Sequence, residues 1–328
     1  MPVGILEIGA HVPDRVIGNG HISQWAEVPE EWVTERTGIK ERRYASPDTA
    51  TSDLAYEAVS ELLSKRPGIE AEIGWLVVAT ATPDQPQPAT AAVLQDRLGL
   101  DGAAAFDLNA VCSGFVYAVA TGAGLLAANP AQRPYALVVG ADKFSSVMDR
   151  SDRRTVSLFG DGAGAVLLGP VPDGYGIRAS RLVSHGSLWP LIGVWAGGTR
   201  KPLTSRARRA GEHTLRMDGK AISRYMFSTL PEVIDDTLKE SSLTLGEIDR
   251  FIFHQANTRL LEKVVAELGI DPVRVPTTAP EFGNTGAASI PLTLRAAHES
   301  RPIRRGERIL VASVGGGMNA AAAVFIWH

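Results

Sequence analysis

The segment Glu72-Ile-Gly-Trp-Leu-Val-Val-Ala79 recurs later in the chain as Glu247-Ile-Asp-Arg-Phe-Ile-Phe-His254. Both copies are short apolar runs that follow an acidic residue, a pattern typical of a buried strand. Other pairs repeat at nearly the same offset of about 170 to 175 residues, namely 97–101 with 267–271 and 135–140 with 308–313. Repetition at a fixed period indicates that the structure is duplicated.

In each copy, strand-like apolar runs alternate with helix-like segments. This alternation predicts an α/β fold whose mainly parallel sheets are covered by helices on both faces. Glycine and proline concentrate at Pro170-Val-Pro-Asp-Gly174, which favours a boundary at this point. The sequence therefore predicts two similar halves, residues 1–170 and residues 171–328.

The chain has a single cysteine, Cys112, just before a Gly/Ala-rich apolar run at 114–128. This run predicts a helix, so the thiol would face a helix N-terminus and its unpaired N–H groups. A helix N-terminus lowers the pKa of a thiol. This decrease is smaller than the one needed to form a thiolate at neutral pH, so we expect a second group that stabilises the thiolate. Taken alone, a single cysteine is more often a small buried apolar side chain.

Two further polar residues fall on comparable turns. His254 ends an apolar run and precedes a segment with helical spacing at 260–268. Asn284 lies in a glycine-flanked turn before another helix, at the position that corresponds by the repeat to Asn109. Taken singly, His254 is better explained as a histidine whose hydrogen bonds are satisfied within the structure, and Asn284 as a helix cap. Together with Cys112 they predict one cleft with a nucleophile set.

Three segments resemble the active-site motifs of β-ketoacyl-[acyl carrier protein] synthase III, the initiating condensing enzyme of type II fatty acid synthesis: Ala110-Val-Cys-Ser-Gly-Phe115, His254-Gln-Ala-Asn257 and Gly283-Asn-Thr-Gly-Ala-Ala-Ser-Ile-Pro291. The resemblance runs along the whole chain. It implies a duplicated thiolase fold, with mixed, mainly parallel sheets in a layered αβαβα arrangement. The family also includes priming synthases and acyltransferases of polyketide and other secondary pathways.

The resemblance implies a decarboxylative Claisen condensation. Cys112 takes the acyl group from an acyl-CoA primer, while the N–H groups of Cys112 and Gly316 form the oxyanion hole. A malonyl thioester, carried on acyl carrier protein or on CoA, then loses CO₂. His254 and Asn284 hold the enolate oxygen as neutral donors, and the enolate carbon attacks the acyl group. This chemistry requires neither a metal nor an organic cofactor.

The resemblance also implies which residues contact the substrates. Trp32 and Arg153 lie on opposite sides of the adenine, and Arg36 lies near phosphate. The pantetheine channel is lined by Gly219, Ala256 and Asn257. Arg224 and Arg259 belong to the surface that docks a carrier protein. Met318 bounds the acyl pocket, and Gln87 approaches that pocket from the partner subunit of a homodimer.

Departures from the family pattern concern the substrate. Gln87 replaces an aromatic or small residue, Met318-Asn-Ala320 replaces Phe-Thr-Trp, and Ala266 and Glu267 occupy docking positions that are often basic. A buried amide without a partner costs about 1 to 3 kcal/mol, so we expect a primer other than acetyl or a long straight chain. Two alternatives stay open: a priming acyltransferase that works without decarboxylation, and a non-catalytic partner of another synthase.

Composition excludes several other classes of protein. A formal net charge of −3 argues against nucleic-acid binding. No basic segment precedes an apolar one and no run of 18 apolar residues is found, so the sequence predicts neither a signal peptide nor a membrane span. One cysteine cannot form an internal disulfide, which agrees with a cytoplasmic location. The scattered histidines predict no metal site.

Overall fold

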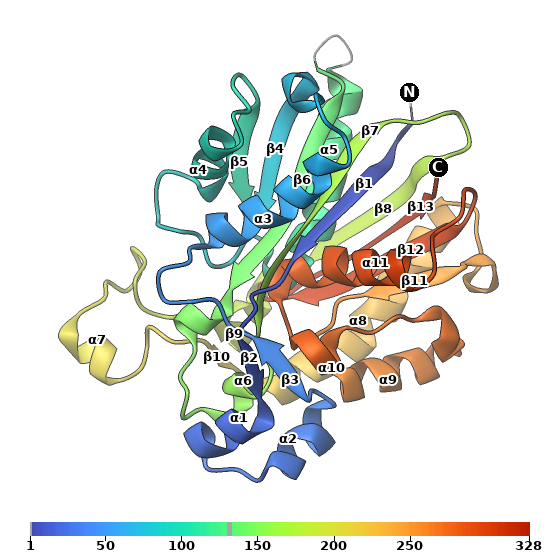
Figure 1. Cartoon of the computed structure of the whole chain (residues 1–328). Coiled ribbons are helices and arrows are strands. Elements are labelled where there is room, and N and C mark those ends of the chain that lie inside the picture. Colours follow the sequence, from blue (N-terminus) through green and yellow to red (C-terminus); the bar gives the residue numbers. More distant parts are fainter. Residues whose placement is uncertain (1, 130–132) are drawn as a thin grey trace.

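A computed structural model describes residues 2–129 and 133–328. Within these residues, two large sheets form the framework (Figure 1). The first sheet comes from the first half of the chain and has the strand order β1-β7-β6-β4-β5. Its strands are β1 (Val3–His11), β4 (Ile73–Ala79), β5 (Ala104–Leu108), β6 (Tyr135–Lys143) and β7 (Asp161–Pro170).

The second sheet comes from the second half and has the order β11-β12-β13-β8. Its strands are β8 (Gly176–Ser184), β11 (Arg250–Phe253), β12 (Arg308–Gly315) and β13 (Asn319–Ile326). Two small ribbons pair β2 (Val16–Gly18) with β3 (Glu41–Arg43) and β9 (Ile192–Gly193) with β10 (Arg216–Met217). The chain passes from β7 to β8 through residues 171–175, next to the predicted boundary between the halves.

Helices cover the two sheets in three layers. Helices α3 (Thr51–Ser64) and α4 (Thr90–Arg97) pack on the outer face of the first sheet, and α8 (Gly219–Glu240) and α9 (Thr258–Glu267) on that of the second. Between the sheets lie α5 (Gly114–Ala128) and α11 (Ser289–Ser300), whose apolar side chains share one core with strands of both sheets. The expected αβαβα layering is thereby confirmed.

Shorter helices complete the structure. Figure 1 shows α1 and α2 together beyond one end of the sheets and α7 on an excursion away from them. The bounds are α1 (Asn19–Ala26), α2 (Glu30–Thr37), α6 (Arg153–Val156), α7 (Ser205–Arg209) and α10 (Ala279–Phe282). The 3₁₀ turns are η1 (Glu70–Glu72), η2 (Val111–Ser113), η3 (Phe144–Val147), η4 (Gly186–Leu191), η5 (Leu245–Glu247), η6 (Pro272–Arg274) and η7 (Gly286–Ala288).

The order of elements repeats between the halves. In the first half, β4 and α4 are followed by η2 with α5, and then by β6 and β7. In the second half, β11 and α9 are followed by η7 with α11, and then by β12 and β13. The turns η2 and η7, which also contact one another, are therefore equivalent. This places the loops of Asn109 and Asn284 side by side, as the sequence repeat predicts.

One part of the fold prediction was wrong. The sheets are mixed, but they are not mainly parallel. Strand β4 pairs in parallel with β5 and β6, and β11 with β12, whereas β1–β7, β6–β7, β12–β13 and β8–β13 are antiparallel. Each half ends with two strands, β6–β7 or β12–β13, that no long crossover helix joins. Such a connection reverses the chain direction and produces antiparallel pairs.

The segment Val111–Ala128 is long and apolar enough to cross a membrane, with a mean hydropathy of 1.7. It contains α5, which packs between the two sheets with Phe115, Val116 and Val119 in the shared core. A helix that is apolar on all sides belongs in such a buried position. Burial in the core therefore explains its composition.

We expect Leu294→Ala to destabilise both halves at once, because Leu294 in α11 is 0% exposed and packs in the core shared by both sheets. The cavity should lower the free energy of unfolding by about 2 to 5 kcal/mol. Urea denaturation followed by circular dichroism measures this loss. The control Leu203→Ala, at a side chain 42% exposed, should change it by less than about 0.5 kcal/mol. Equal effects of the two changes would contradict the shared core.

Candidate active site

Cys112 lies in the turn η2, two residues before Gly114, the first residue of α5. Its side chain is buried. The preceding residue, Val111, has a φ of 49°, a left-handed conformation that is rare for a β-branched residue. The side-chain oxygen of Asn109 accepts a hydrogen bond from the Val111 N–H at 3.1 Å and so supports this turn. Backbone strain of this kind is concentrated at functional sites.

The glycine turn 315–317 lies directly against the Cys112 loop. A Cβ placed on Gly315 would be 2.6 Å from the carbonyl oxygen of Ala110 and 3.0 Å from the amide nitrogen of Cys112. Only glycine therefore allows the two backbones to approach this closely. The side-chain NH₂ of Asn319 donates to the Gly316 carbonyl at 2.6 Å and holds the turn.

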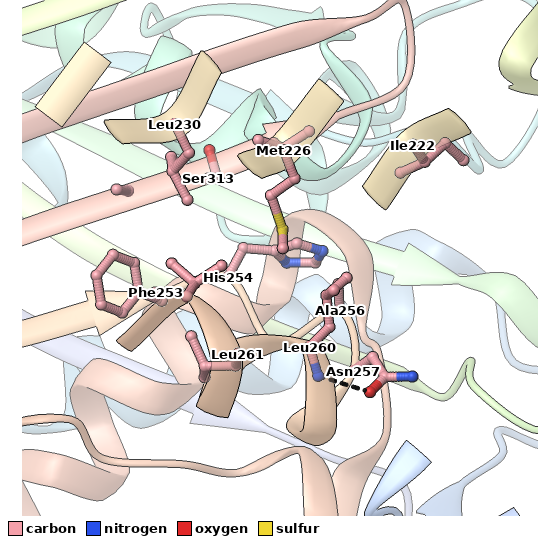
Figure 2. A pocket seen from close by; sticks show the side chains of 13 residues that line it. Ile222, Met226, Leu230, Phe253, His254, Ala256, Asn257, Leu260, Leu261 and Ser313 are labelled. Carbon is pink, nitrogen blue, oxygen red and sulfur yellow. Dashed lines mark hydrogen bonds between the residues drawn. The ribbon is translucent and has the colours of Figure 1, made fainter. Parts of the chain in front are cut away.

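His254 follows the last residue of β11, and its backbone N–H donates to Ala312 of β12 at 2.9 Å. Figure 2 shows the imidazole among apolar side chains of α8 and α9, with Met226 extending toward it. Burial lowers the pKa of His254 to about 4. The imidazole is therefore neutral at pH 7. Its Nδ1 lies 2.8 Å from the hydroxyl oxygen of Ser289.

Asn284 is fixed by the first half of the chain. Its N–H donates to Leu158 at 2.8 Å, and its carbonyl oxygen accepts from the Gly160 N–H at 3.0 Å. Its side-chain oxygen accepts from the Gly286 N–H at 3.0 Å. Because an N–H group can only donate, this bond fixes which end of the amide is oxygen. The NH₂ group is then the end available to donate to a ligand.

The three predicted catalytic residues line one cavity of about 150 Å³ together with Gly316. Met318 also lines this cavity, as expected for an acyl-pocket residue. The cavity shares four residues with a wider mouth of about 620 Å³: Leu158, Met217, Gly219 and Asn257. The mouth carries the basic residues Arg36, Arg153, Arg154 and Lys220. A thioester on a phosphate-bearing carrier fits such a basic mouth with an inner apolar cavity.

The predicted CoA residues lie along this path. Trp32, Arg36 and Arg153 line the mouth, while Ala256 lines the inner cavity. The Arg153 guanidinium carbon lies 5.4 Å from the centre of the Trp32 ring. A purine stacked between them requires about 7 Å, twice a normal contact distance. The predicted adenine sandwich therefore requires Arg153 to move.

Asn257 combines two structural bonds with its place on the path. Its side-chain oxygen caps α9 by accepting from the Leu260 N–H at 3.1 Å, the bond drawn in Figure 2. Its NH₂ group donates to the Arg36 carbonyl at 3.3 Å. The residue thus ties the start of α9 to the end of α2, and it lines both the cavity and the mouth.

Three other predicted residues lie outside the cavity. Arg224 and Arg259 are exposed on α8 and α9, and Arg259 pairs with Glu262 at 3.1 Å. Gln87 is exposed on the loop between β4 and α4, and it does not line the cavity of its own chain. Its predicted position at a partner's pocket requires a second subunit.

The expected lowering of the Cys112 pKa was wrong. Burial raises the pKa of the thiol, and the carboxylate of Asp142 raises it further. These effects outweigh the helix N-terminus, whose contribution is at most about 2 kcal/mol. Asp142 itself is fully buried, and burial raises its pKa to about 6. At pH 7 and above it is therefore mainly an anion, and Cys112 is a neutral thiol.

Asp142 is a buried carboxylate next to the site that the sequence did not reveal. Its carboxylate accepts from the N–H groups of Ala81 and Ala287, both at 2.8 Å, and from the hydroxyls of Thr80 and Thr82. It thus joins the Asn284 loop of one half to a loop of the other. Ser289 and Gln255 were also missed. The Gln255 side-chain oxygen accepts from the N–H groups of residues 278 and 279 at 3.2 and 3.4 Å.

We expect Asp142→Asn to lower the pKa of Cys112, because it removes a negative charge that disfavours the thiolate. Below that pKa, alkylation by iodoacetamide should be faster by roughly ten-fold for each unit of decrease. The melting temperature should fall, since an amide has one acceptor oxygen and either the Ala81 or the Ala287 N–H loses its acceptor. Intact-mass measurement of alkylation rates from pH 6 to 10 compares the thiolate fractions of the two proteins, and so the direction of the pKa change. The control is Asp161→Asn, a buried carboxylate bonded to Ser145 and Ala45. An unchanged Cys112 pKa in Asp142→Asn would contradict this role.

Comparison with protein families matches residues 106–186 to 3-oxoacyl-[acyl-carrier-protein] synthase III and residues 238–327 to its C-terminal region. An acetoacetyl CoA synthase of Streptomyces sp. strain CL190, NphT7, is 44% identical over 326 residues, 98% of each chain. β-Ketoacyl-[acyl-carrier-protein] synthase III 2 of Deinococcus radiodurans is 37% identical over 325 residues, 99% of this chain and 94% of its own.

Solved structures agree with these matches. The synthase III of Thermus thermophilus superposes with a TM-score of 0.92 at 37% identity, covering 99% of both chains. A priming β-ketosynthase of a polyketide pathway gives 0.90 at 29% identity, covering 99% of this chain and 96% of its own. Identity above 30% over nearly the whole chain settles the family. The chain belongs to the β-ketoacyl-[acyl carrier protein] synthase III family of thiolase-like condensing enzymes, which are acyltransferases.

Proposed function

We propose that this enzyme condenses an acyl-CoA primer with a malonyl thioester through an acyl group on Cys112. The observation that carries the proposal is the convergence of Cys112, His254 and Asn284 on one cavity. That cavity continues into a basic mouth suited to the phosphates of CoA or of a phosphopantetheine arm.

In the first step, the Cys112 sulfur attacks the carbonyl carbon of the primer thioester. A bond forms between the Cys112 sulfur and the acyl carbon, the bond to CoA sulfur breaks, and the thiol proton leaves on CoA. The negative charge on the carbonyl oxygen is stabilised by the N–H groups of Cys112 and Gly316. The close approach of Gly315 to the Cys112 amide supports this oxyanion hole.

In the second step, the malonyl thioester loses CO₂ and the electron pair of the broken C–C bond forms an enolate. His254 and Asn284 donate hydrogen bonds to the enolate oxygen. The neutral state of His254 and the fixed amide of Asn284 support this role. The enolate carbon then attacks the acyl carbon and Cys112 leaves as a thiolate, which is reprotonated. Simple acyl transfer needs no such donor pair, so the pair favours condensation over the acyltransferase alternative.

Malonyl on a carrier protein is the acceptor that the family name implies, and malonyl-CoA is the second candidate. The 44% identity to an acetoacetyl CoA synthase favours malonyl-CoA. The exposed Ala266 and Glu267 on α9 also favour it, because Glu262 and Glu267 balance the charges of Arg259 and Lys263 and leave this helix without net positive charge. The inner cavity of about 150 Å³ suits a short primer. The expected preference for a primer other than acetyl rests on Gln87 and stays a prediction.

A homodimer is part of the proposal. Strand β5 forms an edge of the first sheet, and its residues Phe106 and Leu108 are half-buried. Edge strands with apolar side chains are usually covered, and a twofold partner is the commonest cover. Gln87 is exposed in the same half of the chain and is free to reach a partner's cavity.

We expect Cys112→Ala to form no acyl adduct with acyl-CoA, because the nucleophile is gone. Asn284→Ala should still be acylated but should lose malonyl decarboxylation by about 10²- to 10³-fold, the usual effect of removing one such donor. Intact mass reports the adduct, and CO₂ release reports decarboxylation. The control Asn129→Ala, at the end of α5, should leave both steps unchanged. A stable adduct on Cys112→Ala would overturn the nucleophile, and unimpaired decarboxylation in Asn284→Ala would overturn the enolate donor.

We expect malonyl-CoA to serve as acceptor at least as well as malonyl-[acyl carrier protein], given the weak docking charge around Arg259. Product masses from a panel of acyl-CoA primers with each acceptor measure this. Glu267→Lys should increase the rate several-fold when malonyl-[acyl carrier protein] is the acceptor. The rate with malonyl-CoA serves as the internal control. A strong wild-type preference for the carrier protein would exclude the second candidate. Acetyl-CoA as the best primer would refute the expectation based on Gln87.

A further inference from the structure

We propose that Ser289 is a positioning residue that holds the neutral imidazole of His254 in the tautomer with its proton on Nε2. In that tautomer the side chain presents a hydrogen-bond donor to the cavity. The tautomer is a property of the protein itself. Only its consequence for catalysis rests on the proposed function.

The geometry places Ser289 where it serves two neighbours. It is the first residue of α11 and is 1% exposed. Its hydroxyl oxygen lies 2.8 Å from Nδ1 of His254 and 2.8 Å from the backbone nitrogen of Gln255. The Gln255 N–H can only donate, so the hydroxyl oxygen accepts that bond.

The single hydroxyl proton then has one acceptor. Within residues 2–129 and 133–328, the remaining hydrogen-bond partner of the Ser289 oxygen is Nδ1 of His254. If the hydroxyl donates to Nδ1, that nitrogen carries a lone pair. A neutral imidazole has one N–H, so the proton is on Nε2. The opposite tautomer would leave a buried hydroxyl proton unpaired, which folded proteins avoid.

The surroundings of His254 support a neutral ring. Burial is the cause that lowers its pKa to about 4, and apolar residues such as Met226 and Leu260 line its pocket (Figure 2). Ser289 offers a hydrogen bond without a charge, so it orients the ring and does not favour the imidazolium. An aspartate at the same place would favour the charged form.

This tautomer has a consequence for the two chemical steps. A ring with its proton on Nε2 donates to an enolate oxygen together with the NH₂ group of Asn284. The same ring cannot take a proton from Cys112 at Nε2. Acylation then proceeds without His254 as the base, with the thiol proton leaving on the CoA sulfur, whereas decarboxylation depends on His254.

Nuclear magnetic resonance tests the tautomer directly. Two-bond ¹H–¹⁵N correlations of ¹⁵N-histidine-labelled protein distinguish protonation at Nδ1 from protonation at Nε2, and the His254 signals are those absent from His254→Ala. We expect the Nε2–H pattern in the wild-type protein. We expect a shift toward Nδ1–H in Ser289→Ala and retention of Nε2–H in Ser289→Thr. The wild-type spectrum alone decides the point if Ser289→Ala does not fold.

A matched control comes from the same helix. Thr293 is buried one turn later, and its hydroxyl donates to the Ser289 carbonyl at 2.7 Å without touching His254. Thr293→Ala should keep the Nε2–H pattern. A wild-type Nδ1–H pattern, or a Ser289→Ala protein that keeps Nε2–H, would overturn the proposal.

Kinetics separates positioning from a general structural role. Ser289→Ala should acylate Cys112 within about two-fold of the wild-type rate and lose malonyl decarboxylation by at least about ten-fold. Ser289→Thr should recover most of that loss. Equal losses in both steps would contradict a positioning role. If the wild-type protein does not decarboxylate malonyl thioesters, the proposed function fails while the spectra still decide the tautomer.

Discussion

The close approach of two helix N-termini at the centre of the molecule is the constraint on which the site depends. Helices α5 and α11 begin at equivalent turns, η2 and η7, which contact one another. A Cβ on Gly140 of β6 would lie 2.3 Å from the Ala287 carbonyl oxygen, so only glycine lets η7 pack this closely on that strand. The positive ends of both helices therefore face one cavity. In the proposed reaction, these helix ends would stabilise the negative charge of an oxyanion or an enolate.

Buried polar groups hold this arrangement together, and they influence the chemistry. Asp142 joins the two halves through the N–H groups of Ala81 and Ala287, but its charge also opposes the thiolate form of Cys112. Burial acts in the same direction, so both effects favour the neutral thiol of Cys112. A neutral thiol and a neutral histidine suit a reaction in which charge appears transiently on substrate oxygens.

The repeat and the strand-to-helix turns predicted the duplication and the convergence of Cys112, His254 and Asn284, whereas the αβαβα layers followed from the family resemblance. The sequence did not predict the strand directions, because the period of a strand is the same in parallel and antiparallel pairs. Asp142 and Ser289 escaped notice because their partners are far away in the sequence. Predicting the pKa of the Cys112 thiol would have required knowing how deeply that thiol is buried. Placing Gln87 requires the surface of a partner subunit, which the sequence of one chain does not describe.

The central layer also affects how the chain is made. Helix α11, at residues 289–300, packs against β1 and β7 of the first sheet. A ribosome that adds about 5 to 20 residues per second needs roughly 6 to 26 s to proceed from the end of β7 to the end of α11. During that interval, the inner face of the first sheet lacks one of its two covering helices. The nascent first half thus presents an apolar surface to chaperones until α11 has been synthesised.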